Sequence, residues 1–212
     1  MRGDRGLGLV DAGQNPRAFR HSQPPTPDDR DRGLDPRSCP AQDHSVIQLA
    51  HERPEHRGDI AALLRSTFGG NDEAALVARL HDDGLTVLSL IALEGAEVVG
   101  HVLFSQINVT IDGHALSTVA LAPVAVAPSR QRQGIGSLMI RQELDELKQT
   151  DVVAVIVLGH PGYYPRFGFS AALARKLEAP IEGDAFMALE LRPNALAGLT
   201  GVARYPKAWR IG

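Results

Sequence analysis

Three apolar segments separated only by short turns constrain the fold of this chain most strongly. The first, Leu85–Leu93, is joined to Val98–Ile111 by the turn Glu94-Gly95-Ala96-Glu97. The dipeptide Asp112-Gly113, a strong hairpin signal, precedes the third segment, Ala115–Val126. Turns this short join antiparallel neighbours, because a parallel pair needs a crossover of about a dozen residues or more. The sequence therefore predicts an antiparallel meander, which excludes a doubly wound Rossmann order.

Helical and strand-like patterns flank this meander. Before it, the chain predicts a strand at Val46–Arg53, a helix over residues 55–68, and a second helix capped by Asn71 and ended by Gly84. After it, the chain predicts a helix at Gly134–Gln149, a strand at Val152–Leu158, a short helix and a strand at Phe186–Leu191. The predicted fold class is mixed α/β (α+β), formed by one domain over residues 46–212.

Residues 1–45 differ in composition from the rest of the chain. They hold 6 of the 14 prolines, 7 Arg and 7 Asp, and few large apolar residues. Such a segment buries too little apolar surface to offset the entropy of ordering, so a disordered tail is expected, with a partner-binding arm as the alternative. A second hypothesis is that the native chain starts near Val46 and the tail is a misassigned start. The intact mass of the protein from its own host tests this.

Composition also excludes several classes of protein. The net charge of −3 falls entirely after residue 45, so no basic field attracts nucleic acid. Cys39 is the only cysteine, which excludes a Cys-based zinc cage and an internal disulfide, and no His-x-x-x-His pair beside a Glu suggests a metal. No apolar run approaches the about 20 residues of a membrane helix. We therefore expect a cytoplasmic protein with no metal and no nucleic-acid or membrane partner.

A polar loop between a strand and a helix carries the first chemical signal. The strand ends at Val124-Ala125-Val126-Ala127-Pro128, and the helix opens through Gly134 and Gly136. Unpaired N–H groups at a helix start favour an anion, and glycine lets the backbone approach it closely. The loop therefore predicts a phosphate or pyrophosphate site. It lacks the Gly-Lys-Ser/Thr of a Walker A loop and the third glycine of a dinucleotide fingerprint.

Two motifs in this order resemble those of the GNAT superfamily of N-acetyltransferases. Gln131-x-x-Gly134-x-Gly136 resembles the superfamily's acetyl-CoA signature, and Tyr164 stands four residues before the pair Gly168-Phe169, as a tyrosine often does there. The stretch from about Val46 to Trp209 resembles the YhbS-like branch of predicted GNAT acetyltransferases. The resemblance implies a mostly antiparallel sheet in which the strand at Val124–Val126 splays from its parallel neighbour.

The resemblance also implies a binding mode for acetyl-CoA. The pantetheine arm would pair with the backbone of Val124 and Val126, and one N–H there would polarise the thioester. Backbone N–H groups of the loop would hold the pyrophosphate, while Arg130 and Arg132 would either reach phosphates or remain solvated. The cofactor-binding residues expected on this basis are Val124, Ala125, Val126, Gln131, Arg132, Gln133, Gly134, Ile135, Gly136 and Ser137.

The reaction implied is direct attack of an amine on the thioester. Tyr164 is the candidate acid that protonates the leaving thiolate, or it packs on the cofactor without proton transfer. The segment Ala115–Val126 contains no acidic residue, so the carboxylate base of some relatives is missing, and a water chain, Glu73 or His160 remains as the alternative. Each has a simpler explanation: Glu73 stabilises a helix start, and His160 forms a turn.

The missing carboxylate leaves a second functional class open, a non-catalytic acyl-CoA-binding or regulatory module. The acceptor would be a small-molecule or peptide amine. Either a monomer or a homodimer is compatible with the sequence, because the apolar segment Leu196–Trp209 would pack on its own sheet or on a partner. We expect the former.

Overall fold

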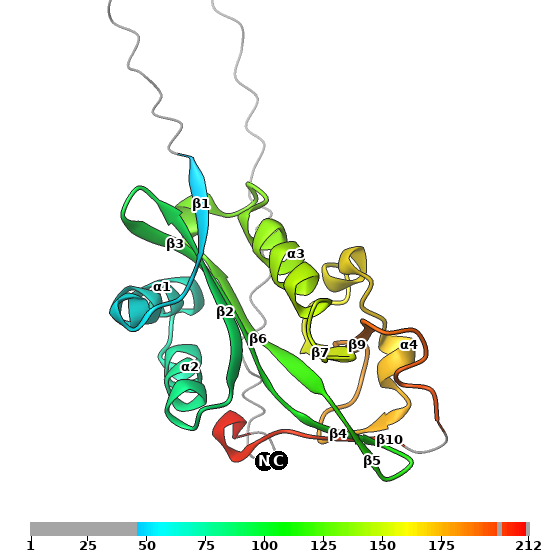
Figure 1. Cartoon of the computed structure of the whole chain (residues 1–212). Coiled ribbons are helices and arrows are strands. Elements are labelled where there is room, and N and C mark those ends of the chain that lie inside the picture. The colour runs from blue at the N-terminus through cyan, green and yellow to red at the C-terminus, as the bar shows by residue number, and fades with distance from the viewer. Residues whose placement is uncertain (1–45, 199–200, 211–212) are drawn as a thin grey trace, which may run out of the picture.

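The computed structural model describes residues 46–198 and 201–210 (Figure 1). The predictions for residues 1–45 lie outside this range. The strands are β1 (Ile47–His51), β2 (Thr86–Glu94), β3 (Glu97–Gln106), β4 (Asn108–Ile111), β5 (His114–Leu116), β6 (Thr118–Val126), β7 (Ala154–Leu158), β8 (Leu177–Glu178), β9 (Phe186–Glu190) and β10 (Gly201–Arg204). The α-helices are α1 (Arg57–Phe68), α2 (Asp72–Asp82), α3 (Ile135–Leu147) and α4 (Ala171–Ala174), and short 3-10 helices lie at Pro54–His56, Pro128–Arg130, Tyr164–Phe167 and Lys207–Trp209.

The main sheet has six strands in the order β1-β2-β3-β6-β7-β9. Its first four strands are antiparallel neighbours, which confirms the predicted meander. The pair β6–β7 is parallel and β7–β9 is antiparallel, so the sheet is mixed, as predicted. Both Asp112 (φ 48°) and Gly113 (φ 81°) have positive φ, which the tight hairpin between β4 and β5 requires.

The prediction of one long strand at Val98–Ile111 is wrong in one respect. The chain leaves the main sheet at Ile107, and β4 and β5 join a second sheet of order β5-β4-β10-β8. The buried Thr118 hydroxyl donates to the Ile107 carbonyl (3.0 Å) and satisfies this polar group between the two sheets. Apolar patterning continues through this point because Ile107 is itself buried, so the pattern alone did not reveal the break.

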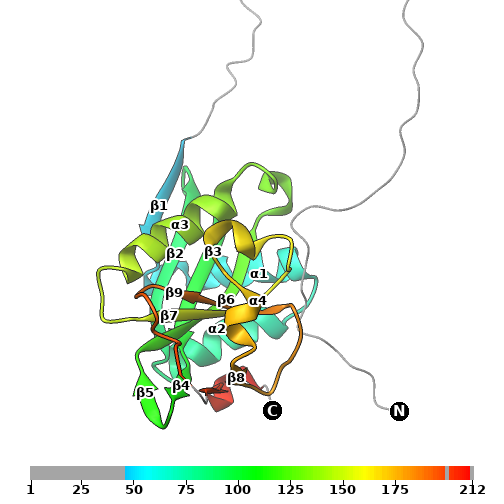
Figure 2. The same cartoon turned by 90° about the vertical axis from the view of Figure 1, so that its right-hand side faces the viewer.

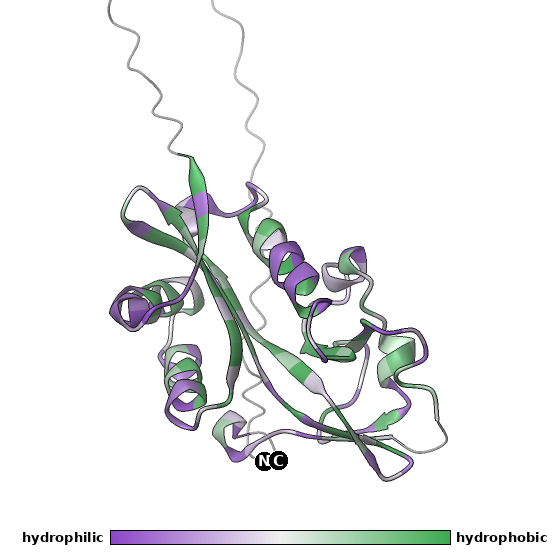
Figure 3. Ribbon diagram, viewed as in Figure 1, coloured by the Kyte–Doolittle hydropathy of each residue, from purple (hydrophilic) through white to green (hydrophobic). Residues whose placement is uncertain are grey.

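Helices cover both faces of the main sheet, with α1 and α2 on one face and α3 on the other, while α4 lies beside the edge strand β9 (Figures 1 and 2). Two apolar cores result, one beneath α1 and α2 and one beneath α3, and the buried Ala174 of α4 belongs to the first. The apolar sides of the helices face the sheet, and their polar sides face outward (Figure 3). Gly100 of β3 permits close approach of α3, because a Cβ there would lie 2.8 Å from the Met139 Cε.

The helix boundaries agree with the sequence pattern, with one difference in capping. Gly69 (φ 73°) ends α1 and Gly84 (φ 65°) follows α2, both in the left-handed conformation that glycine adopts without strain. Asn71 precedes α2 as expected, but its side chain makes no cap; it accepts a hydrogen bond from Arg65 Nε (2.8 Å). Within the described residues, no helix has the length and apolarity to cross a membrane.

The C-terminal segment packs on its own sheet, as expected. Strand β10 pairs with β4 and β8. Trp209 is buried and donates through Nε1 to the Ser105 hydroxyl (3.1 Å), while Arg79 of α2 donates to the Ala208 carbonyl (2.7 Å). This segment therefore closes the end of the α1/α2 side.

Candidate active site at the β6–β7 opening

The parallel strands β6 and β7 separate part of the way along their length. Their pairing runs from Thr118↔Ala154 to Leu121↔Val157 and then stops. Strand β6 continues to Val126, and of the strands that the structure describes, β3 alone pairs with it there. An unpaired strand edge therefore faces a gap within the sheet, and this edge offers hydrogen bonds to an extended ligand.

The backbone of Val124 faces this gap. Hydrogen bonding alternates along an antiparallel pair, and Ala127 N–H donates to the Val99 carbonyl of β3 (2.8 Å). By the same register Ala125 pairs with His101, so the polar groups of Val124 and Val126 point the other way. Of the three strand residues predicted to bind pantetheine, Ala125 is therefore turned toward β3, with its side chain buried in the α1/α2-side core.

The Val126 carbonyl is already occupied. It accepts hydrogen bonds from Gln131 Nε2 (3.1 Å) and from the Thr67 hydroxyl of α1 (3.4 Å). This contact explains the glutamine of the motif: its side chain ties the loop after β6 back to the end of that strand. Gln133 Nε2 similarly donates to the Ser129 carbonyl (3.3 Å).

The loop enters α3 through two left-handed residues, Arg132 (φ 61°) and Gly134 (φ 86°). This conformation turns successive N–H groups toward one side, as in backbone anion sites. The first intrahelical bond runs from Leu138 N–H to the Gly134 carbonyl (2.9 Å). The N–H groups of Ile135, Gly136 and Ser137 therefore have no intrahelical acceptor.

The two loop arginines differ in their surroundings. Arg130 donates through Nε to the Glu94 carboxylate (2.6 Å), and this neighbour raises the pKa of its guanidinium. Arg132 is exposed. Glu94 is the last residue of β2, far from Arg130 in sequence, so no local pattern revealed this ion pair.

Two tyrosines follow β7: Tyr164 begins the short 3-10 helix Tyr164–Phe167, and Tyr163 directly precedes it. The Tyr163 hydroxyl is 3.2 Å from the Ser137 hydroxyl of α3, and its ring meets the Tyr164 ring edge-on at 5.2 Å between centroids. A Cβ on Gly136 would lie 3.4 Å from the Tyr163 hydroxyl and 3.5 Å from Val126 Cγ2. Gly136, Tyr163 and Val126 therefore meet on the α3 side of the opening.

Tyr164 lies against the end of β7. A side chain at Gly159 would overlap its ring, so only glycine fits there. Burial raises the pKa of Tyr164 well above its usual range, so the phenol keeps its proton at neutral pH. Among the described residues, no hydrogen bond engages its hydroxyl, in contrast to that of Tyr163.

The two side chains considered as the general base, His160 and Glu73, lie in different surroundings. His160 is exposed, and its Nδ1 accepts a hydrogen bond from Gly162 N–H (3.0 Å). This contact stabilises the turn after β7. Glu73 is buried in the first turn of α2, where the helix dipole stabilises a carboxylate. Strand β6 itself carries no acidic residue.

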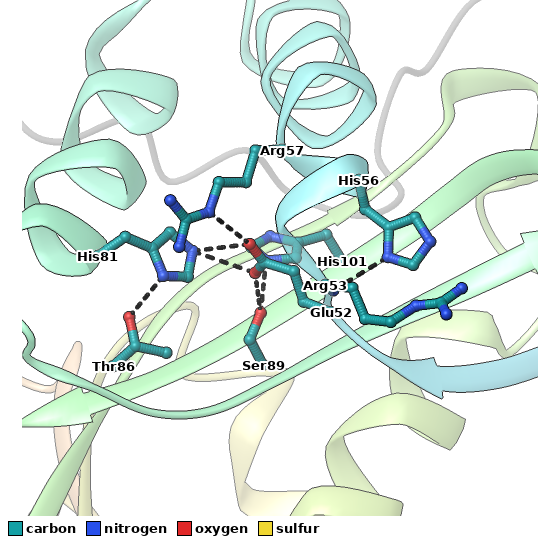
Figure 4. Close-up of polar contacts among 8 residues, drawn as sticks. All are labelled: Glu52, Arg53, His56, Arg57, His81, Thr86, Ser89 and His101. Atoms are coloured by element: carbon teal, nitrogen blue, oxygen red, sulfur yellow. Dashed lines mark hydrogen bonds and ion pairs between the residues drawn. The ribbon is translucent and has the colours of Figure 1, made fainter.

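A buried polar network that the sequence did not suggest lies on the α1/α2 side of the sheet (Figure 4). The Glu52 carboxylate accepts from the Ser89 hydroxyl (2.5 Å) and lies 2.9 Å from His81 Nε2 and 3.6 Å from His101 Nε2. These hydrogen bonds hold the pKa of Glu52 well below its usual range against the opposing effect of burial. Burial lowers the pKa of His101, which is therefore neutral. Among the described residues, no hydrogen bond, ion pair or ring contact links this network to Tyr164.

Comparisons with known proteins agree with this geometry. A family model described as an acetyltransferase (GNAT) domain matches residues 52–172. The uncharacterized N-acetyltransferase YhbS of Escherichia coli K12 is 37% identical over 157 residues, covering 73% of this chain and 93% of that protein.

Two solved structures share the fold over nearly their full length. Escherichia coli YhbS in complex with CoA has a TM-score of 0.71 and 35% identity, covering 77% of this chain and 92% of that one. A GNAT acetyltransferase from Brucella melitensis in complex with acetyl-CoA has a TM-score of 0.65 and 30% identity, covering 78% and 99%. The chain belongs to the GNAT family of acetyltransferases.

Proposed function

We propose that this protein transfers the acetyl group of acetyl-CoA to a primary amine at the opening between β6 and β7. The observation that carries the proposal is the end of the β6–β7 pairing at Leu121↔Val157, beside a helix start with unpaired N–H groups. A strand edge and an anion site side by side suit a pantetheine arm that ends in a pyrophosphate. The CoA and acetyl-CoA complexes of the two solved relatives support this.

The hydrogen bonds of the loop and of β6 indicate which backbone groups are available to the cofactor. Val124 offers its N–H and C=O to the pantetheine amides, while Val126 offers its N–H, since its carbonyl is bound by Gln131. The N–H groups from Gln131 to Ser137 hold the pyrophosphate, and Gly136 keeps the space beside them open. Arg132 is the cation left for a phosphate, because Arg130 is paired with Glu94.

The chemistry is direct acyl transfer. An alkyl ammonium loses its proton with a pKa of about 10.4, so the amine attacks as its neutral form. The C–N bond forms as the C–S bond breaks, and the sulfur leaves as a thiolate. Tyr164, protonated at neutral pH and free at its hydroxyl among the described residues, donates to that sulfur. With no carboxylate on β6, water takes the amine proton.

The acceptor is a small-molecule or peptide amine. The protein works in the cytoplasm, where acetyl-CoA is available, as a monomer or homodimer, and without nucleic-acid partners. The even balance of 22 basic and 25 acidic residues supports the last point.

Cofactor placement is tested by Gly136→Val. The added methyl groups enter the space bounded by Tyr163 and Val126, so we expect acetyl-CoA affinity to fall at least about tenfold with the fold retained. Isothermal titration with acetyl-CoA measures this. Gly58→Val is the matched control, because it is also a helical glycine but nothing lies within 4 Å of its Cβ position. Equal affinity in both variants would place the cofactor elsewhere.

A further inference from the structure

Three potential metal ligands converge between β1 and α3, outside the acetyl-transfer site. They are His51 at the end of β1 and Glu143 and Glu146 on α3. Each offers one ligand atom, and these atoms all lie within 4.8 Å of one another. Figure 2 shows α3 crossing over β1 and β2, which brings residues almost a hundred positions apart in sequence together. We propose that His51, Glu143 and Glu146 bind a divalent transition metal ion, with Zn²⁺ as the best match.

Glu143 provides the strongest reason. Its side chain is completely buried, yet neither carboxylate oxygen has a hydrogen-bond partner among the described residues. A buried, unpaired carboxylate is unfavourable unless it stays protonated or pairs with a cation. Burial and the neighbouring Glu146 raise the pKa of Glu143 to about 8, as expected of a carboxylate without a counter-charge. A bound cation supplies that charge.

The ligand geometry suits a small ion. His51 Nε2 already lies 3.4 Å from Glu146 Oε2, close to the separation of two ligands that each bind Zn²⁺ at about 2.0–2.2 Å. The third ligand, Glu143, is one helical turn from Glu146 and points to the same side. One imidazole nitrogen with two carboxylates favours Zn²⁺ over Mg²⁺ or Ca²⁺, which prefer oxygen ligands alone. Water completes the coordination.

The ion would have a structural role. Glu143 lies two helical turns beyond Gly136, so the site is at the other half of α3 from the cofactor loop. Among the described strands, β1 lies at the edge of the main sheet and pairs with β2 alone. A metal bridge from His51 to α3 would therefore fasten this edge strand to the helix that opens the cofactor site. Acetyl transfer itself needs no metal.

Zn²⁺ binding by the full chain, produced without an affinity tag, tests the proposal. We expect one Zn²⁺ per chain by isothermal titration, a rise in Tm on adding Zn²⁺, and absorption bands of ordered coordination with Co²⁺. His51→Ala and Glu143→Gln should each weaken binding at least about tenfold. Glu143→Gln keeps the shape of the buried side chain, so loss of binding does not require loss of the fold.

His114→Ala is the matched control, because His114 is exposed on β5, away from the cluster. It should bind Zn²⁺ like the parent chain. All variants retain Cys39 and the other residues of the N-terminal segment, so differences among them report on the cluster alone. Zn²⁺ affinity equal in all four proteins, or no binding by the parent chain, would overturn the proposal and leave Glu143 as a buried neutral acid.

Discussion

Tyr164→Phe is expected to lower kcat for acetyl transfer about 10²–10⁴-fold, while the KM for acetyl-CoA changes little. The substitution removes only the hydroxyl, so the ring still packs against Gly159 and Phe169. What is lost is the proton or hydrogen bond given to the departing sulfur, which matters in the transition state and not in the bound ground state. Initial rates of CoA release across acetyl-CoA concentrations separate the two parameters.

The role of Tyr164 as an acid also predicts how the rate of the parent enzyme depends on pH. Burial raises the pKa of Tyr164, so the parent enzyme should keep its acid up to at least about pH 10, and its rate should rise with pH as the amine loses its proton. Tyr205→Phe is the matched control, because burial also raises the pKa of Tyr205, whose ring packs at a tilt against Trp209 in the C-terminal segment. A Tyr164→Phe enzyme as fast as this control would assign Tyr164 to packing alone.

Glu52→Ala is expected to lower the free energy of unfolding by about 3 kcal/mol. The Glu52 carboxylate is the common acceptor for Ser89 and His81 and lies beside His101, and its side chain is only 5% exposed. Removing it takes away this shared acceptor and leaves Ser89 with His101 (3.1 Å) and His81 with Thr86 (3.0 Å) as hydrogen-bond partners. Urea unfolding at neutral pH measures the change. Glu55→Ala is the control: Glu55 is exposed and forms a surface ion pair with Arg53, so a loss below about 1 kcal/mol is expected there.

This network also makes stability depend on pH, with a defined sign. Both Glu52 and His101 have lowered pKa values in the folded state, so the unfolded chain binds protons first as the pH falls. Stability should be full above 6.5, the pKa of an ordinary histidine, and decline below it, and more steeply below 4.5, the ordinary pKa of a glutamate, where unfolded Glu52 is protonated. Glu52→Ala should flatten the lower part of this curve. An unchanged curve would show that other groups dominate acid unfolding.

Local sequence signals predicted the elements that rest on local physics. The hairpin turn needs positive φ at two positions, and Asp112 and Gly113 both adopt it. The apolar run that ends at Leu158 forms a strand that is covered on both faces. The break at Ile107 was not predicted, because a strand that passes from one sheet to another remains apolar throughout. The second sheet is also completed by β10, which lies far along the chain and gives no local signal.

The sequence marks the loop before α3 but does not reveal the side-chain contacts around it. Gly134 and Gly136 mark the loop because glycine geometry is visible in the sequence. The pairing of Arg130 with Glu94 and the buried cluster around Glu52 depend on tertiary contacts between residues that are tens of positions apart. No spacing rule reveals such pairs in a single sequence.

Acetyl transfer to amines is the most direct test of the central claim. The full chain is mixed with acetyl-CoA and a panel of small amines and peptides, and N-acetylated product and free CoA are measured together by mass spectrometry. The predicted result is equal amounts of both products for at least one acceptor, with transfer reduced in Gly136→Val and Tyr164→Phe. Tight binding of acetyl-CoA without transfer to any amine would contradict it and identify a non-catalytic acyl-CoA-binding module.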